Sequence, residues 1–155
     1  MKIILPEAIE KKLISSLRKA GNLEIGGILM GEHISESTFL VKEITIQKHH
    51  GTSVSFVRSI ANILVPLKHF FKKTDYNYTK YNYLGEWHSH PQFLIEPSST
   101  DSQTMRDIVE DSEVGANFVI LMIVRLDERK ELEGTVTVYL PKREAYRGQL
   151  VQKIV

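Results

Sequence analysis

Apolar residues at helical spacing predict three helices, and the first of them is the clearest. Ile9, Leu13 and Leu17 recur every fourth residue within 6–20, so one face of this segment is apolar. Gly21 follows at the position where a left-handed glycine commonly ends a helix. We therefore expect an amphipathic helix over residues 6–20.

A second helix is expected over about 59–73, and a third from Ser98 or Ser99 to Gly115. Pro66 lies inside the second helix and should kink or split it, because proline lacks a backbone N–H and clashes with the preceding turn. The expected apolar faces are Ile60, Leu64, Leu67 and Phe71 in the second helix, and Met105, Ile108 and Val109 in the third.

Shorter apolar runs predict strands between these helices. Residues 23–32 should form a buried strand with 39–47 as its hairpin partner, and 81–90 and 116–125 should form further strands. Apolar and polar residues alternate over 134–140, which predicts a strand with one buried and one solvated face. Its inward residues should be Val136, Val138 and Leu140, and its outward residues Thr135, Thr137 and Tyr139.

The order of these segments indicates the fold class. Residues 141–155 fit either a helix or a strand. Helices mixed with strands, some of them hairpin neighbours, predict an α/β or α+β sandwich around a mixed sheet. A chain of 155 residues is about the size of one domain and can bury a substantial core.

Composition narrows the classes of partner and compartment. The net charge of +1 provides no broad field that would attract nucleic acid or an anionic membrane. The longest apolar run, 118–124, is much shorter than the ~20 residues of a membrane-spanning helix. Charged residues from Glu7 onward do not fit a signal peptide. We expect a cytoplasmic protein with neither membrane nor nucleic acid as its partner.

Two histidines and an aspartate stand in the pattern H-x-H-x10-D. His88 and His90 are two residues apart in an expected strand, so both side chains point to one face. Asp101 follows at the start of an expected helix, where the chain can return to the same place. Two imidazoles and one carboxylate can hold a zinc ion and leave its fourth position open, as in catalytic zinc sites. The chain has no cysteine, so zinc would be held by nitrogen and oxygen alone.

Each part of this pattern also has an ordinary structural explanation. An H-x-H pair on a strand can be coincidence, Asp101 can be a first-turn carboxylate favoured by the helix dipole, and Ser98 can be a helix cap. Their combination is harder to explain in this way, so we predict metal binding. His49 and His50 could compete for the metal, although adjacent residues of an extended chain point apart.

The stretches EIGGILMG at 24–31, HSHP at 88–91 and SSTD at 98–101 occur in this order. Together they resemble the signature of the JAMM metalloproteases, in which a glutamate on an early strand precedes an H-[ST]-H-P segment with an S-x-x-D ending. The resemblance covers nearly the whole chain. It implies one MPN (JAB) domain over 1–155, an α/β fold of cytidine-deaminase-like architecture whose mixed, mostly antiparallel sheet is flanked by helices.

The resemblance also implies roles for individual residues. His88, His90 and Asp101 would bind one zinc ion, with a water in the fourth position. Glu24 would hydrogen-bond to that water, take its proton and later deliver a proton to the leaving amine. Ser98 would donate a hydrogen bond to the oxyanion that forms on the scissile carbonyl. Without the downstream motif, Glu24 would be a solvated charge at the start of a strand.

The activity implied by the family is hydrolysis of the amide bond after the C-terminal tail of a ubiquitin-like protein, in conjugates or in precursors and fusions. The loops 48–56 and 92–97 are placed to shape a groove for that tail. The context YLGEW at 83–87 is similar to bacterial members of antiphage conjugation systems, so activating or conjugating enzymes of one operon are expected partners.

Two alternatives remain open. The substrate could instead be a ubiquitin-like sulfur-carrier protein, or the chain could be a non-catalytic MPN scaffold. Scaffold members usually lack one or more ligands, whereas the three ligands and the glutamate are all present here. The identity of the ubiquitin-like protein, the bond type and the oligomeric state stay undetermined.

Overall fold

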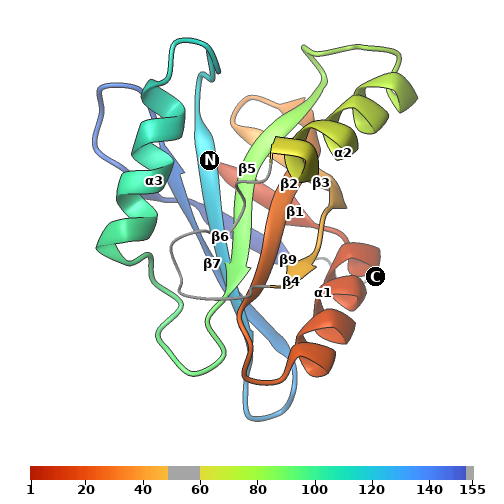
Figure 1. Ribbon diagram of the computed structural model, residues 1–155, viewed down its shortest axis with the longest axis vertical. Helices are drawn as coiled ribbons and strands as arrows, with labels where there is room; N and C mark the ends of the chain where they lie inside the picture. The colour runs from red at the N-terminus through yellow and green to blue at the C-terminus, as the bar shows by residue number, and fades with distance from the viewer. Residues whose placement is uncertain (49–59, 153–155) are drawn as a thin grey trace.

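The computed structural model describes residues 1–48 and 60–152, and Figure 1 shows the arrangement of their helices and strands. The first half of the chain contains β1 (Lys2–Leu5), α1 (Glu7–Ala20), β2 (Ile25–Ser35), β3 (Thr38–Ile44), β4 (Gln47–Lys48) and α2 (Ile60–Lys73). The second half contains β5 (Tyr81–Ser89), α3 (Ser99–Glu110), β6 (Val119–Leu126), β7 (Leu132–Tyr139), β8 (Tyr146–Arg147) and β9 (Gln149–Gln152).

All of these strands belong to one sheet with the order β8-β7-β6-β5-β2-β3-β1-β9, and β4 also pairs with β2. The β5–β6, β1–β3 and β1–β9 pairs are parallel, and the other pairs are antiparallel. The predicted α/β class, a mixed sheet flanked by helices, is therefore confirmed. None of the described helices is long and apolar enough to cross a membrane.

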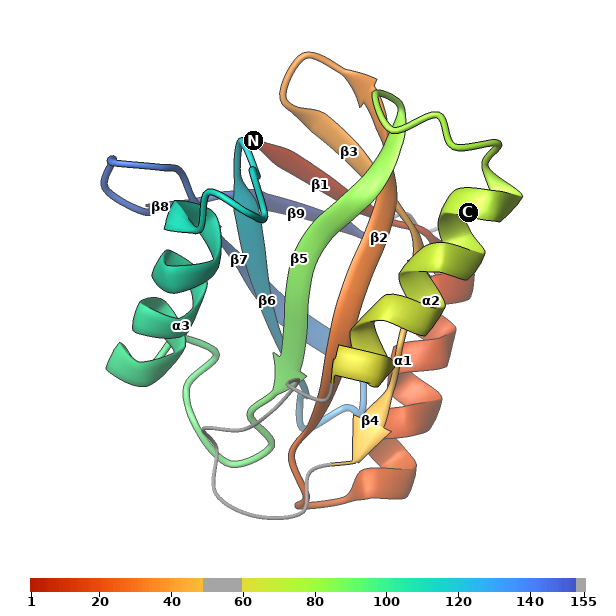
Figure 2. The ribbon, with the colours of Figure 1, turned by 45° about the horizontal axis from the view of Figure 1, so that its top comes forward.

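The helices cover the sheet from both faces. On one face, α1 buries Ile9, Leu13 and Leu17 in the largest core cluster, which also holds Trp87 of β5. On the other face, α2 packs over β2 and β5 while α3 packs over β6 and β7, as Figure 2 shows. Because side chains alternate along a strand, His88 lies on the α2–α3 face, opposite to Trp87.

Residues 146–152 connect the two ends of this sheet. In β8 they pair with β7, and in β9 they pair with β1. At the junction, the Gly148 N–H donates to the Val136 carbonyl, 2.9 Å away, and the Gln149 N–H donates to the Met1 carbonyl, also 2.9 Å away. One extended stretch thus serves both edges. The sequence pattern left it open between helix and strand because neither edge is visible in the sequence.

Part of each of two predictions for α2 needs correction. The helix α2 continues through Pro66 without splitting, and Leu64 is 45% exposed. Its packed face is formed by Phe70 with Ile63, Leu67 and Phe71, so the prediction is confirmed for Leu67 and Phe71 and wrong for Leu64. Packing of this face against β2 outweighs the hydrogen bond that Pro66 removes, since most helical stability in proteins comes from tertiary packing.

The end of α3 and one face of β7 also differ from the predictions. The helix ends at Glu110, with Asp111 as its C-cap, and Gly115 (φ 61°) lies in the turn that follows. Tyr139 was expected to face solvent but is 1% exposed, because α3 covers that face of β7. Alternation in the sequence indicates two chemically different faces and cannot show that both are covered.

Gly27 of β2 lets the backbone of that strand lie close to Thr45, the residue that follows β3. A Cβ atom at this position would lie 2.1 Å from the Thr45 carbonyl oxygen, which accepts a hydrogen bond from the Trp87 indole at 2.9 Å. The Thr45 hydroxyl in turn accepts the Ile28 N–H at 2.9 Å. Gly27 is therefore needed for space.

We expect Gly27→Ala to destabilise the fold by about 3 kcal/mol, since overpacking of a rigid interior costs about 1–3 kcal/mol and occasionally more. Gly115→Ala is the matched control, because Gly115 has φ 61° and the nearest atom to the added Cβ, the Ser112 carbonyl oxygen, lies at an ordinary contact distance of 3.8 Å. The control should lose only about 1 kcal/mol, the usual cost of a left-handed alanine. Denaturant unfolding followed by fluorescence of Trp87, the single tryptophan, measures both. Equal losses would contradict this explanation.

Candidate metal centre

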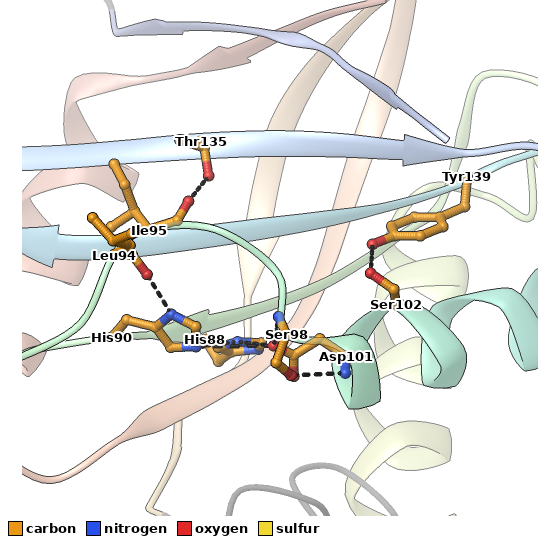
Figure 3. A network of polar contacts seen from close by, with 9 residues as sticks. All are labelled: His88, His90, Leu94, Ile95, Ser98, Asp101, Ser102, Thr135 and Tyr139. Carbon is orange, nitrogen blue, oxygen red and sulfur yellow. Dashed lines mark hydrogen bonds and ion pairs between the residues drawn. The ribbon is translucent and has the colours of Figure 1, made fainter. Parts of the chain in front are cut away.

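Three side chains predicted to bind metal converge at the end of β5, where α3 begins (Figure 3). The Nε2 atoms of His88 and His90 lie 3.0 Å apart. Asp101 Oδ2 lies 3.6 Å from the His88 Nε2 atom and 4.0 Å from that of His90. The three side chains are only 10–12% exposed. The structure therefore brings this part of the predicted site together.

The strand and the helix supply these groups for simple geometric reasons. His88 and His90 are two residues apart on an extended chain, so both point to the α2–α3 face. The His90 N–H donates to the Val124 carbonyl, 3.0 Å away, which continues the β5–β6 pairing past the end of β5. The chain then turns through 91–97 and enters α3, whose first turn carries Asp101.

A backbone carbonyl orients the ring of His90. Its Nδ1 atom lies 2.8 Å from the carbonyl oxygen of Leu94, which can only accept, so Nδ1 carries the hydrogen. The Nε2 atom of a neutral imidazole then has its lone pair toward the cluster. A hydrogen bond on the far nitrogen is the usual way in which proteins fix the tautomer of a metal-binding histidine.

Asp101 is held by a reciprocal contact with Ser98, the N-cap residue of α3. The Ser98 N–H donates to Asp101 Oδ2 at 2.8 Å, and the Asp101 N–H donates to Ser98 Oγ at 3.0 Å. Burial raises the pKa of Asp101, but the hydrogen bond and charge of His88 and the hydrogen bonds from Ser98 outweigh burial and lower the pKa to about 2. The carboxylate is therefore anionic at neutral pH.

The donor set fits a tetrahedral cation. Ligand atoms of a zinc ion bound at 2.0–2.1 Å lie about 3.4 Å from one another, and the observed separations of 3.0, 3.6 and 4.0 Å bracket that value. Two nitrogen lone pairs at 3.0 Å repel each other unless a proton or a cation lies between them. Within residues 1–48 and 60–152, no other group of three histidine or acidic side chains is placed to hold a metal ion. His49 and His50 lie outside the described residues.

Glu24 lies directly before β2 and is partly buried. Gly26 pairs with His88 across the β2–β5 ladder, so continuing this register by two residues places Glu24 opposite His90. Directly opposed residues of antiparallel strands share a face. The Ile25 N–H donates to Ser89 Oγ at 3.0 Å and fixes this end of β2 against β5. The register thus brings Glu24 to the face of the cluster, and its catalytic role stays a prediction.

Ser98 has two functions available to it. Its oxygen accepts the N–H of Asp101, as an N-cap residue does. A serine hydroxyl that accepts through oxygen still has its own hydrogen to donate. The capping alternative is therefore present in the structure and is compatible with the predicted oxyanion contact, which the structure does not test.

Two supporting groups of the site were not predicted from the sequence. Ser89 is fully buried on the opposite face from the histidines and ties β2 to β5. A small hydroxyl residue between the two histidines was a signal for it, but no role could be assigned without the strand register. The Leu94 carbonyl that orients His90 belongs to the backbone, so no residue type in the sequence could indicate it.

Comparison with known proteins agrees with this geometry. Residues 6–136 match the family model described as prokaryotic homologs of the JAB domain. A protein of Enterobacter hormaechei subsp. hoffmannii (strain UCI 50) named CD-NTase/cGAS isopeptidase is 32% identical over 114 residues. The match covers 72% of this chain and 60% of that protein, so the chain spans about three fifths of the length of this curated relative.

Two solution structures share the fold. A protein from Desulfitobacterium hafniense superposes with a TM-score of 0.71, covering 99% of this chain and 94% of the other. A protein from Salinibacter ruber gives a TM-score of 0.54, covering 99% and 92%. Each is 18% identical in sequence to this chain, so the two similarities show a shared fold and nothing more. Because the family match extends over most of the chain and confirms the resemblance found in its motifs, this protein belongs to the family of prokaryotic JAB-domain homologues.

Proposed function

We propose that this protein is a zinc-dependent peptidase or isopeptidase that hydrolyses the amide bond after the C-terminal tail of a ubiquitin-like protein. Membership of the JAB family and the relative named as an isopeptidase support a hydrolase. The observation that carries the zinc assignment is the convergence of His88, His90 and Asp101 within a few ångströms. Three protein ligands leave a coordination position for chemistry.

The chain's own residues divide the remaining work. Bound zinc would supply a Lewis acid and make hydroxide available near neutral pH. Glu24, on the same face as His90, takes the proton of the attacking water and delivers a proton to the leaving amine. The Ser98 hydroxyl donates to the carbonyl oxygen as negative charge develops on it. The anionic Asp101 leaves the cluster one negative charge, so a divalent ion keeps net positive charge.

The substrate assignment rests on relatives. The Enterobacter protein is named a CD-NTase/cGAS isopeptidase. We extend this to the present chain and propose that it acts in a bacterial antiviral defence system on a nucleotidyltransferase joined to a ubiquitin-like protein. Activating and conjugating enzymes of the same operon would be its partners. A sulfur-carrier substrate would require a neighbouring sulfur-transfer operon instead.

The loop 91–97 presents apolar side chains beside the cluster. Phe93 is 63% and Leu94 is 75% exposed. Their backbone is nonetheless fixed, since Arg125 donates to the Phe93 carbonyl at 3.0 Å and His90 donates to that of Leu94. Rigidly presented apolar side chains lose little entropy on binding. We propose that Phe93 and Leu94 contact the substrate next to the scissile bond. The predicted loop 48–56 lies almost wholly outside the described residues.

Purified protein should contain about one zinc per chain, and His88→Ala or Asp101→Ala should remove most of it, because two remaining ligands hold zinc weakly. Elemental analysis after dialysis measures this. The control is His69→Ala, since His69 is an exposed histidine outside the cluster. Equal zinc content in all variants would show that zinc binds elsewhere, and zinc-free parent protein would contradict the proposed function.

Glu24→Gln should keep the zinc and lose catalysis by about 10²-fold or more, since the amide cannot take a proton and general acid–base groups contribute roughly 10²–10⁴-fold. Cleavage of a ubiquitin-like protein fused to a reporter, and of its lysine conjugate, gives the rates. Glu36→Gln changes an exposed glutamate in a turn and serves as the control. Cleavage by Glu24→Gln at the parental rate would remove Glu24 from the mechanism. A chain that binds zinc but cleaves no fusion or conjugate of any ubiquitin-like protein tried would favour the scaffold alternative.

Replacing both Phe93 and Leu94 by serine should lower kcat/KM by about 30-fold, mainly through KM, since each apolar side chain buried on binding contributes about 1 kcal/mol. Zinc content should not change, because the Leu94 group that orients His90 is its backbone carbonyl. Val65→Ser on α2 is the control, at an apolar side chain with similar exposure, 66%. Unchanged KM in the double variant would exclude this loop from substrate binding.

A further inference from the structure

Two side chains of β7 reach the elements that carry metal-binding groups. Thr135 and Tyr139 lie four residues apart, so both point to the α2–α3 face. The Thr135 hydroxyl donates to the carbonyl of Ile95. The Tyr139 hydroxyl lies 3.2 Å from the hydroxyl of Ser102. Figure 3 shows the two contacts on either side of the cluster. Neither is required by the strand pairing of β7.

The contact of Thr135 lies one residue away from the group that orients His90. Ile95 follows Leu94, whose carbonyl accepts the hydrogen bond from His90 Nδ1 at 2.8 Å. Holding the Ile95 carbonyl against β7 therefore restrains the adjoining peptide unit, which carries the Leu94 carbonyl. If the Leu94 carbonyl moved, the ring of His90 would lose the partner that sets its tautomer and its direction.

The contact of Tyr139 acts on Asp101. Ser102 is the next residue in α3, and its N–H donates to the Ser98 carbonyl at 3.0 Å within the first helical turn. Tyr139 itself is closely packed, since it is 1% exposed and the Arg106 guanidinium lies 5.7 Å from the centroid of its ring. Burial raises the pKa of Tyr139, so its hydroxyl keeps its proton at neutral pH. The start of α3 is thereby held at a fixed height over the sheet.

We propose that Thr135 and Tyr139 are positioning residues that together set the separation between His90 and Asp101. These two groups stand at opposite ends of a loop, whereas His88 lies within β5 and is positioned by strand pairing. A catalytic metal site must be held within about 0.5 Å of its working geometry. One strand that holds both ends of the loop meets this requirement, because β7 is paired with β6 along its whole length.

This inference rests on the proposed zinc site. A positioning role differs from a purely structural role in one measurable respect. A contact that only stabilises the fold changes the unfolding of zinc-free protein and leaves the metal-binding equilibrium of the folded state unchanged. A positioning contact changes the affinity and the coordination geometry. Substitution of groups that orient metal ligands typically costs about 10–100-fold in metal affinity.

The test uses Thr135→Val and Tyr139→Phe, each of which removes one hydroxyl and keeps most of the side-chain volume. Thr137→Val is the matched control, since Thr137 lies between them on the same face and its hydroxyl forms no hydrogen bond within the described part of the chain. Zinc affinity is measured by competition with a chelator, cobalt coordination by visible absorption, and zinc-free stability by thermal unfolding.

Each of the two variants should bind zinc about tenfold more weakly than the parent and show an altered cobalt spectrum. Thr137→Val should match the parent, and Thr135→Ser, which restores the hydroxyl, should regain the parental affinity. Affinities of Thr135→Val and Tyr139→Phe within twofold of Thr137→Val would overturn the proposal and leave the zinc site intact. Weaker binding with an unchanged cobalt spectrum and lower zinc-free stability would also overturn it. A parent that binds no zinc would contradict the proposed function itself.

Discussion

The pairing of β2 with β5 is the constraint on which the candidate site depends. Gly26 opposite His88 defines a register in which the start of β2 and the end of β5 meet on one face. A shift of one residue would turn Glu24 and the histidines to opposite faces of the sheet. The buried hydroxyl of Ser89, bonded to the Ile25 N–H, stabilises the observed register. Ile25 and Ser89 are 64 positions apart in sequence, and the pairing of β2 with β5 brings them together.

The three metal-binding side chains are held in two different ways. His88 is held by strand pairing, whereas His90 and Asp101 depend on a loop and a helix start. The carbonyls of Phe93, Leu94 and Ile95 each accept a side-chain hydrogen bond, so this loop has a fixed backbone despite its exposed side chains. Chemical specificity at the loop surface can therefore vary in evolution while the metal-binding groups keep their places.

Much of the fold and of the site follows from local patterns. The amphipathic spacing of Ile9, Leu13 and Leu17 was sufficient to place α1, and the H-x-H-x10-D pattern was sufficient to select the three clustered side chains. What failed depended on tertiary contacts. Leu64 and Leu67 are both apolar and were both predicted to face inward, and only the packing of α2 decides that Leu64 is exposed. Tyr139 is amphipathic, and only the position of α3 decides that it is buried. Ser89 and the Leu94 carbonyl could not be assigned without strand register.

The stretch 146–152 has a consequence for the behaviour of the domain in solution. It pairs with β7 on one side and with β1 on the other, both of which are rich in β-branched and other apolar residues. Unpaired strands of this kind are templates for self-association between molecules. One short segment pairs with both β7 and β1 and so protects both strands against edge-to-edge aggregation. Detachment of that segment would leave this edge of each strand unpaired at the same time.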